Sequence, residues 1–331
     1  MKDFMYNLQL FAEMNTNLTT SAGLSEEMKT YYSDYLIDNA IPKLVHDQFG
    51  QKHPIPKNGG KTIQFRKYSP LPKLTTPLTE GVTPDGQSLT MSVIEATVAQ
   101  YGGYVTLSDV LLLTAIDNNL VQATKLLGAQ AGATLDTITR EVLNGGTNAI
   151  RSGGKTGRNE LTSADTLAVD DIKKAVRWLK AMNAEQINGS WVGIIHPDVS
   201  YDLTNDPAWK DVKTYSDPSD IYEGEIGKLY GVRFVETTEA KKWVKGKKGN
   251  EDGKATVYST LILGDNAYGV TEITGGGLEH IVKQLGSAGT ADALNQRATA
   301  GWKATKVAEI LVDAYMVRIE SGSTFDDTNE N

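Results

Sequence analysis

The chain has 331 residues, of which 40% are hydrophobic and 22% are charged, a composition typical of a globular protein with a sizeable core. The absence of cysteine excludes disulfides, thiolate metal sites and cysteine nucleophiles. A net charge of −8 argues against attraction of the whole chain to nucleic acid, and no apolar run has the length of a membrane span.

Residues 1–23 combine a short apolar cluster with a stretch rich in Thr, Asn and Ser. The cluster is too small for a core of its own, so this segment is either disordered or docked on another surface. Polar residues interrupt the cluster, which does not fit a signal peptide. Residues 25–49 have helical spacing, with Ser25 as the N-cap and a break at Pro42.

Residues 61–108 predict a long two-stranded arm. Residues 61–68 alternate as a strand does, and extended structure resumes from Val93 to Leu107. Between them, several prolines and the turn Pro84-Asp85-Gly86 exclude a helix or a central strand. A lone hairpin is marginal in water, so the arm needs a surface to lie on, and a neighbouring subunit is the natural candidate.

Residues 117–143 predict one long helix, because apolar positions recur every three or four residues from Leu120 to Val142. Asp117 or Asn118 is the candidate N-cap, and Asn144-Gly145-Gly146 ends the helix. Gly128 and Gly132 lie inside it, one helical turn apart. Two readings stay open for this pair: a bend or close backbone approach, or simple tolerance on a packed face.

Residues 161–275 have an α/β pattern. We expect a helix over 169–182, strands at 190–195, 231–236 and 258–263, and a short helix opened by His196-Pro197-Asp198. Extended structure is expected again over 279–283 and 308–320, and residues 324–331 are expected to form a flexible tail. The fold class is therefore α+β.

No motif supports catalysis. Two Gly-Gly-Lys-Thr runs, at 59–62 and 153–156, lack the earlier glycine of a phosphate-binding loop. The four histidines are scattered, and no metal or other cofactor is expected. His196 before Pro197 fits a helix start better than a general base. The sequence accordingly predicts a protein that is not an enzyme.

A basic loop at 241–254 holds six lysines and one tryptophan. Its lysines offer point charges to phosphate and its tryptophan offers a stacking surface, so that contact with DNA is one interpretation. A solvated turn between two strands is the other. The residues concerned are Lys241, Lys242, Trp243, Lys245, Lys247 and Lys248.

The order of these elements resembles the major capsid proteins of tailed bacteriophages with the Hong Kong ninety-seven-type fold, in particular the N-four-like family. The similar stretches include Gly59-Gly60-Lys61-Thr62-Ile63-Gln64-Phe65-Arg66 and Ile195-His196-Pro197-Asp198. Others are residues 32–37, 78–84, 100–105, 224–234 and 308–312. The resemblance extends from about residue 25 to residue 323, with a weaker likeness of residues 1–20 to the start of other phage head proteins.

The resemblance implies a role for each region. Residues 1–60 would be an N-terminal arm and 61–108 the extended loop that overlaps a neighbouring subunit. Residues 109–160 with 276–323 would form the peripheral domain, with 117–143 as its spine helix, and 161–275 the axial domain. The implied intersubunit contacts are Phe65, Tyr68, Leu71, Leu74, Leu78 and Val82. Gly128 and Gly132 would let the spine helix bend.

The function implied is self-assembly into an icosahedral shell of hexamers and pentamers that encloses double-stranded DNA. The partners would be further copies of the chain, with portal, scaffold and decoration proteins and weakly bound DNA, and no membrane. The shell would form in the bacterial cytoplasm and become part of the virion. Two alternatives stay open: the shell of an encapsulin-like cellular nanocompartment, and a soluble α/β enzyme built on residues 161–275.

Overall fold

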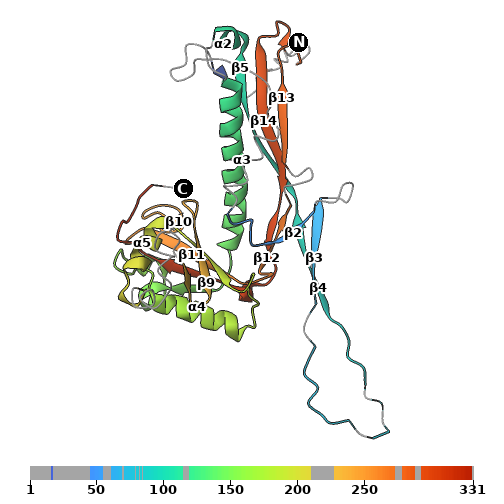
Figure 1. Cartoon of the computed structure of the whole chain (residues 1–331), viewed down its shortest axis with the longest axis vertical. Helices are drawn as coiled ribbons and strands as arrows, with labels where there is room; N and C mark the ends of the chain where they lie inside the picture. The colour runs from blue at the N-terminus through green and yellow to red at the C-terminus, as the bar shows by residue number, and fades with distance from the viewer. Residues whose placement is uncertain are drawn as a thin grey trace, which may run out of the picture. The chain divides into compact units, whose positions relative to one another are not determined.

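The computed structural model describes residues 16–17, 45–54, 61–68, 71–78, 80–81, 83, 85–114, 119–209, 227–272, 278–287 and 292–329. The chain divides into two compact units. Unit 1 contains residues 1–41, 101–132 and 278–304, and unit 2 contains residues 42–100, 133–277 and 305–331. The predicted α+β class is confirmed by the mixture of helices and several sheets (Figure 1). The predicted helix over 25–49 lies mostly outside the described residues, and residues 45–49 form turns instead.

Unit 1 consists of a four-stranded sheet with helices. The strand order is β1 (Thr16–Asn17), β5 (Ala99–Ser108), β14 (Arg297–Lys306) and β13 (Leu278–Lys283). The helices are α2 (Asp109–Thr114) and the first part of α3 (Asn119–Leu143). Trp302 is buried and donates its indole Nε1–H to Gln130 Oε1 of α3 over 3.2 Å, which joins helix and sheet.

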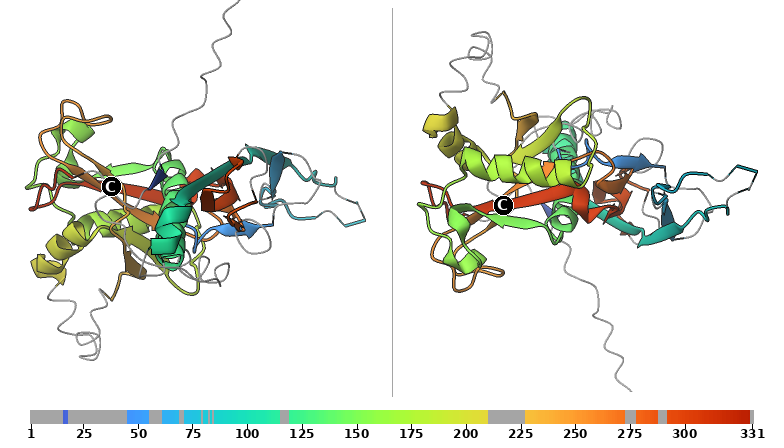
Figure 2. Two further views of the ribbon diagram at one scale, coloured as in Figure 1. Left: turned by 90° about the horizontal axis from the view of Figure 1, so that it is seen from above. Right: turned by 90° about the horizontal axis from the view of Figure 1, so that it is seen from below.

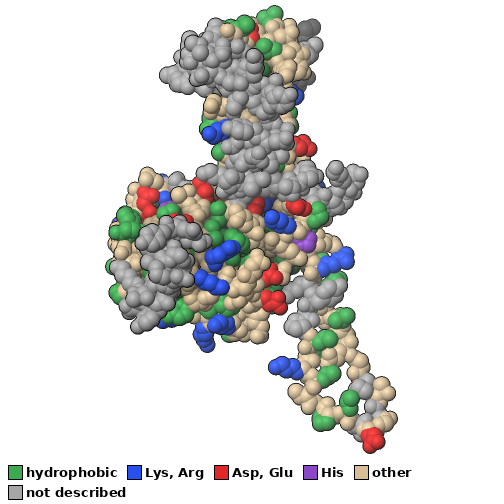
Figure 3. Space-filling model, viewed as in Figure 1, with side chains coloured by type: hydrophobic (Ala, Val, Ile, Leu, Met, Phe, Trp, Pro, Cys, Tyr) green, Lys and Arg blue, Asp and Glu red, His purple; other side chains and the backbone are tan. Residues whose placement is uncertain are grey.

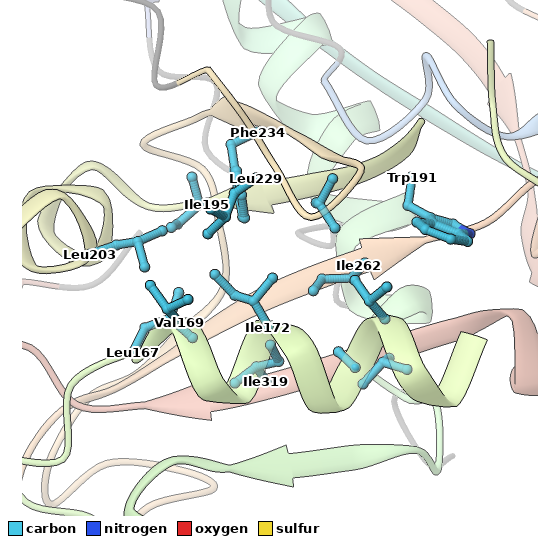
Figure 4. Close-up of a cluster of buried hydrophobic side chains, with 14 of the residues drawn as sticks. Leu167, Val169, Ile172, Trp191, Ile195, Leu203, Leu229, Phe234, Ile262 and Ile319 are labelled. Carbon is cyan, nitrogen blue, oxygen red and sulfur yellow. The ribbon is translucent and has the colours of Figure 1, made fainter. Parts of the chain in front are cut away.

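Unit 2 is built on a seven-stranded sheet. Its order is β6 (Ala149–Arg151), β16 (Met316–Ser321), β11 (Val257–Leu263), β7 (Trp191–Ile195), β9 (Val232–Glu236) and β8 (Lys228–Leu229), with β10 (Lys242–Trp243) also paired to β11. Helix α4 (Val169–Ala181) lies along one face (Figure 2). Its apolar stripe packs on the sheet around Ile172, Ile262 and Ile319 (Figure 4).

Several predicted elements of unit 2 are confirmed. The strands at 190–195, 231–236 and 258–263 correspond to β7, β9 and β11, and the helix over 169–182 is α4. Helix α5 (Pro197–Asn205) begins after His196, whose Nδ1 accepts a hydrogen bond from the Asp198 backbone N–H at 3.2 Å. A side-chain acceptor at this position satisfies an otherwise orphaned donor of the first turn.

Two smaller sheets complete unit 2. One has the order β15 (Ala308–Ile310), β12 (Tyr268–Thr271) and β2 (Gln51–His53). The other is the hairpin of β3 (Thr62–Tyr68) and β4 (Met91–Thr97), antiparallel from Thr62↔Thr97 to Tyr68↔Met91. The short 3₁₀ helices are η2 (Ser152–Gly154), η3 (Arg158–Glu160) and η6 (Asp313–Tyr315).

The structure corrects the extent of the predicted arm. The hairpin ends at Thr97, where the Val98 N–H donates to the Lys61 carbonyl at 2.8 Å, and β5 then joins a different sheet beside β14. At Gly102 a side chain would lie 2.7 Å from the Trp302 carbonyl oxygen, so only glycine permits that approach. Alternating apolar and polar residues indicate a strand, but they do not identify the strand with which it pairs.

The C-terminal part is also corrected. The expected extended run over 308–320 is interrupted by η6, and its two strands belong to different sheets. Because β16 pairs with β11 from Tyr258↔Ser321 to Leu263↔Met316, it belongs to the sheet of the predicted axial region and not to a separate peripheral domain. The predicted flexible tail is anchored as far as Asp327, whose carboxylate pairs with Lys242 at 2.8 Å.

Candidate functional site

The hairpin β3–β4 has a buried root. Ile63, Phe65 and Ala96 are buried together, with Val307 and Leu311 packed against them. The Phe65 ring lies against β12 at Gly269, where a Cβ would come within 2.5 Å of Phe65 Cε1. Phe65 is only 3% exposed because its own chain covers it, and its contact with a neighbouring copy stays a prediction.

The rest of the hairpin is exposed. Every described residue from Leu71 to Leu89 is exposed, and Leu74 and Leu78 have exposed fractions of 79% and 76%. Hydrophobic side chains are visible along this segment in the space-filling view (Figure 3). The predicted contact residue Val82 and the side chain of Tyr68 lie outside what the structure describes. A stretch of exposed apolar side chains marks an interaction surface rather than a folded core.

A buried ionic network lies close to the root of the hairpin. His46 Nδ1 lies 2.7 Å from Asp136 Oδ2 of α3, and the His46 N–H donates to the other oxygen of Asp136 at 2.7 Å. Asp47 accepts from Thr139 at 2.5 Å and pairs with Lys306. Burial lowers the pKa of Lys306, while the Asp47 carboxylate opposes that shift.

This network fixes residues 46 and 47 onto α3, and none of its members was a candidate from the sequence. The one available signal is that Asp136 and Thr139 lie beside Leu135, in the buried stripe of the helix. A polar residue there needs a buried partner, because an unpaired buried polar group is costly.

The long helix predicted over 117–143 is confirmed as α3, although its two candidate caps, Asp117 and Asn118, lie outside the described residues. Thr124, Leu127, Ala131 and Leu135 of its apolar stripe are buried. Gly128 and Gly132 are buried as well, and the boundary between the two units falls directly after Gly132.

Three residues of the basic loop have partners within the chain. Lys241 pairs with Glu141 at 2.7 Å and Lys242 pairs with Asp327, so their charges are used within the chain. Trp243 is 9% exposed and lies under the Arg158 guanidinium, 3.5 Å from the ring centroid. The tryptophan is therefore not available to stack on a base. Lys245, Lys247 and Lys248 are exposed.

Three arginines converge on one buried carboxylate beside this loop. Glu320, fully buried, lies 2.5 Å from Arg158, 3.0 Å from Arg318 and 3.1 Å from Arg151. Burial alone would raise the pKa of Glu320, but the arginines hold it below its usual value. Burial lowers the pKa of Arg318, and repulsion from Arg158 and Arg151 lowers it further.

Two further polar side chains among the described residues of unit 2, Tyr258 and His196, make hydrogen bonds within the chain. The Tyr258 hydroxyl donates to the Asp198 carboxylate at 2.8 Å. Burial and, to a smaller extent, this carboxylate raise the pKa of Tyr258 well above its usual value. Burial lowers the pKa of His196, which caps α5. Lys155 of the second Gly-Gly-Lys-Thr run has extended backbone and opens no helix. Among the described residues no cluster of three metal-ligating side chains occurs, and no helix there is long and apolar enough to cross a membrane.

Comparisons with known proteins agree with this geometry. The capsid of Ralstonia phage GP4 is similar to this chain over 100% of both chains, with a TM-score of 0.65 and 13% identity. The capsid asymmetric unit of cyanophage Pam1 has a TM-score of 0.64 and 15% identity, over 95% of this chain and 100% of that one. The capsid of Helicobacter pylori bacteriophage KHP30 has a TM-score of 0.61 and 10% identity, over 95% of this chain and 96% of that one.

At these identities the solved structures establish the fold. No curated protein matches the chain. A family model described as phage capsid protein matches residues 114–284, which is more than half of the chain. The chain therefore belongs to the phage capsid protein family, and it is a structural major capsid protein and not an enzyme.

Proposed function

We propose that this chain assembles with many copies of itself into a closed icosahedral shell that encloses the double-stranded DNA of a tailed bacteriophage. The observation that carries the proposal is the hairpin β3–β4, whose root is buried in its own unit while Leu71, Leu74 and Leu78 are exposed. A neighbouring copy that covers these side chains would remove apolar surface from water, at about 25 cal/mol per Å².

Closure of a shell does not require strong individual contacts. Each copy makes several contacts at once, and once one contact has formed, the others form at a high effective concentration. The apolar hairpin supplies one such contact per copy. Hexamers and pentamers of one chain, arranged as in the N-four-like family and the Hong Kong ninety-seven-type fold, fit this mode of assembly.

Each region then has a proposed role. Residues 1–60 act as the N-terminal arm, the loop beginning at 61 overlaps a neighbouring copy, and α3 is the spine. Residues 161–275, completed by β6 and β16, form the axial part. The shell belongs to the virion, assembles in the host cytoplasm, and meets portal, scaffold and decoration proteins there.

Gly128 and Gly132 are proposed as the point where α3 bends during shell assembly or expansion. Glycine lowers helix stability by about 1 kcal/mol relative to alanine, so a pair one turn apart makes this segment the easiest to deform. The double variant Gly128→Ala/Gly132→Ala is expected to change the yield or the expansion of shells. Normal shells that expand normally would argue against the bend.

Electron microscopy of the expressed full chain tests the function. Regular closed particles are expected for the wild type, and none for Leu74→Ser/Leu78→Ser, which removes apolar surface from the hairpin. Lys173→Gln/Lys180→Gln, on the exposed side of α4, is a matched control that should form particles. A wild-type chain that stays monomeric at all concentrations would overturn the proposal.

A further inference from the structure

The positive charge of this acidic protein is concentrated in two short segments. Residues 151–165 and 241–254 together hold nine Lys and Arg against four Asp and Glu, a net charge of +5, although Lys241 and Lys242 pair with Glu141 and Asp327 outside these segments. The whole chain has a net charge of −8, so the remaining residues carry −13. Such an asymmetry is the electrostatic footprint expected of a surface that meets an anionic partner.

The fold of unit 2 brings these two segments together. Arg158 donates to the Gly249 carbonyl at 3.2 Å and lies over the Trp243 ring. Leu161, Trp243 and Val257 form a small buried cluster beneath the contact. The two segments are therefore one surface, and Arg158 is the residue that joins them.

Three of the four carboxylates in these segments accept hydrogen bonds from backbone N–H groups. Glu160 accepts from the backbone N–H groups of Thr156 and Gly157 at 3.1 and 3.3 Å. Asp165 accepts from the Thr162 N–H at 2.9 Å, and Glu251 accepts from the Gly249 N–H at 3.0 Å. These carboxylates shape turns, and each is oriented toward backbone donors.

The basic side chains, in contrast, keep access to solvent. Lys245, Lys248 and Lys254 are exposed, and Lys155 Nζ lies 3.9 Å from the Asp165 carboxylate. The side chains of Arg151 and Arg158 remain 27% and 22% exposed although both contact Glu320. One glutamate balances only one of the three arginines around it.

We propose that this composite surface, formed by Arg151, Lys155, Arg158, Lys245, Lys248 and Lys254, binds the phosphate backbone of DNA without sequence preference. The inference rests on the proposed function, which brings the chain next to packaged DNA. Lysine and arginine side chains at such a surface contact the phosphates, which carry no sequence information, and not the base edges. With Trp243 covered by Arg158, stacking on bases adds nothing, which favours duplex DNA over a single strand.

Fluorescence anisotropy of a labelled 30-base-pair duplex, titrated with the full chain at several salt concentrations, tests this surface. The logarithm of the binding constant falls with the logarithm of salt by about 0.9 per phosphate contact. Lys245→Gln/Lys248→Gln/Lys254→Gln is expected to flatten that slope by about 2 to 3 and to weaken binding at least about tenfold in low salt. The matched control Lys173→Gln/Arg177→Gln/Lys180→Gln loses the same charge from α4 and should keep the wild-type slope.

Three results would overturn the inference: no measurable binding by the wild type, equal slopes for the two triple variants, or competition by polyglutamate as strong as by DNA of equal charge. The last result would assign the surface to an acidic protein. Electron microscopy of the same variants separates this inference from the proposed function. A lysine triple variant that still forms particles but binds DNA more weakly supports both the proposed function and this inference. Failure of the wild type to form particles counts against the proposed shell function alone.

Discussion

The sheet of unit 2 and the hairpin β3–β4 use apolar residues in opposite ways. Every residue of β11 and β16 is buried, whereas every described residue between Leu71 and Leu89 is exposed. The sheet is covered by α4 and α3 of the same chain, and nothing described in unit 2 covers the hairpin beyond its root. Hydrophobicity in the first region stabilises the monomer, and in the second it is available for assembly.

The largest effect on stability is expected at the root of the hairpin. Phe65→Ala should lower the free energy of unfolding by about 3 to 5 kcal/mol, because it leaves a cavity against Gly269 and His53. Chemical denaturation of the unassembled full chain measures this. Val93→Ala, on an exposed position of the same hairpin, should change it by less than about 0.5 kcal/mol. Equal losses of stability for Phe65→Ala and Val93→Ala would contradict the distinction between the buried root and the exposed part of the hairpin.

A somewhat smaller loss is expected at the centre of the arginine cluster. Glu320→Gln should lower the free energy of unfolding by roughly 3 kcal/mol, since it leaves three guanidinium groups without a counter-charge. Glu279→Gln breaks the exposed pair with Lys303 and is the control, with an expected loss below about 1 kcal/mol. A Glu320 variant as stable as the control would show that the cluster does not hold β16 in place.

Glu320 also predicts a pH dependence. Because its pKa is lower in the folded chain than in the unfolded chain, its contribution is fully present above the usual glutamate value of 4.5. It is lost as pH falls below that value through the folded pKa. Denaturation at pH 7 and at pH 4 should therefore differ less for Glu320→Gln than for the wild type. An unchanged difference would contradict this linkage.

A modest effect is expected where the C-terminal segment meets the sheet. Tyr258→Phe removes the hydroxyl that donates to Asp198 and accepts from the Asp327 N–H at 3.2 Å. The expected loss is about 1.5 to 3 kcal/mol, the range for hydrogen bonds to a charged group. Tyr201→Phe, at a half-exposed ring, should have no effect. Faster proteolysis of the C-terminal segment in the Tyr258 variant alone would add to the evidence.

The smallest change in monomer stability is expected for the exposed part of the hairpin, between Leu71 and Leu89. Leu74→Ser/Leu78→Ser should alter the free energy of unfolding by less than about 0.5 kcal/mol, because both side chains are already in water. The same variant is expected to abolish closed particles. A monomer that is strongly destabilised by these substitutions would mean that the hairpin folds back onto its own chain.

Local patterns in the sequence were enough to predict α3, α4, β7, β9 and β11, because helical spacing and continuous apolar runs report burial directly. The proline-rich hairpin and the start of α5 at Pro197 followed from backbone chemistry that also acts over a few residues. By contrast, β14 escaped prediction although Ala298, Ala300, Trp302 and Ala304 alternate with other residues and are buried, because alanine is a weak strand former.

Pairing between distant segments was decided only by the tertiary structure. Whether β5 continues the hairpin or joins β14, and whether β16 belongs with β11, depends on partners far away in the chain. The same holds for Phe65, Trp243 and Glu320, whose environments are made by other elements. A residue's type limits which contacts it can make, but its burial depends on what the fold brings against it.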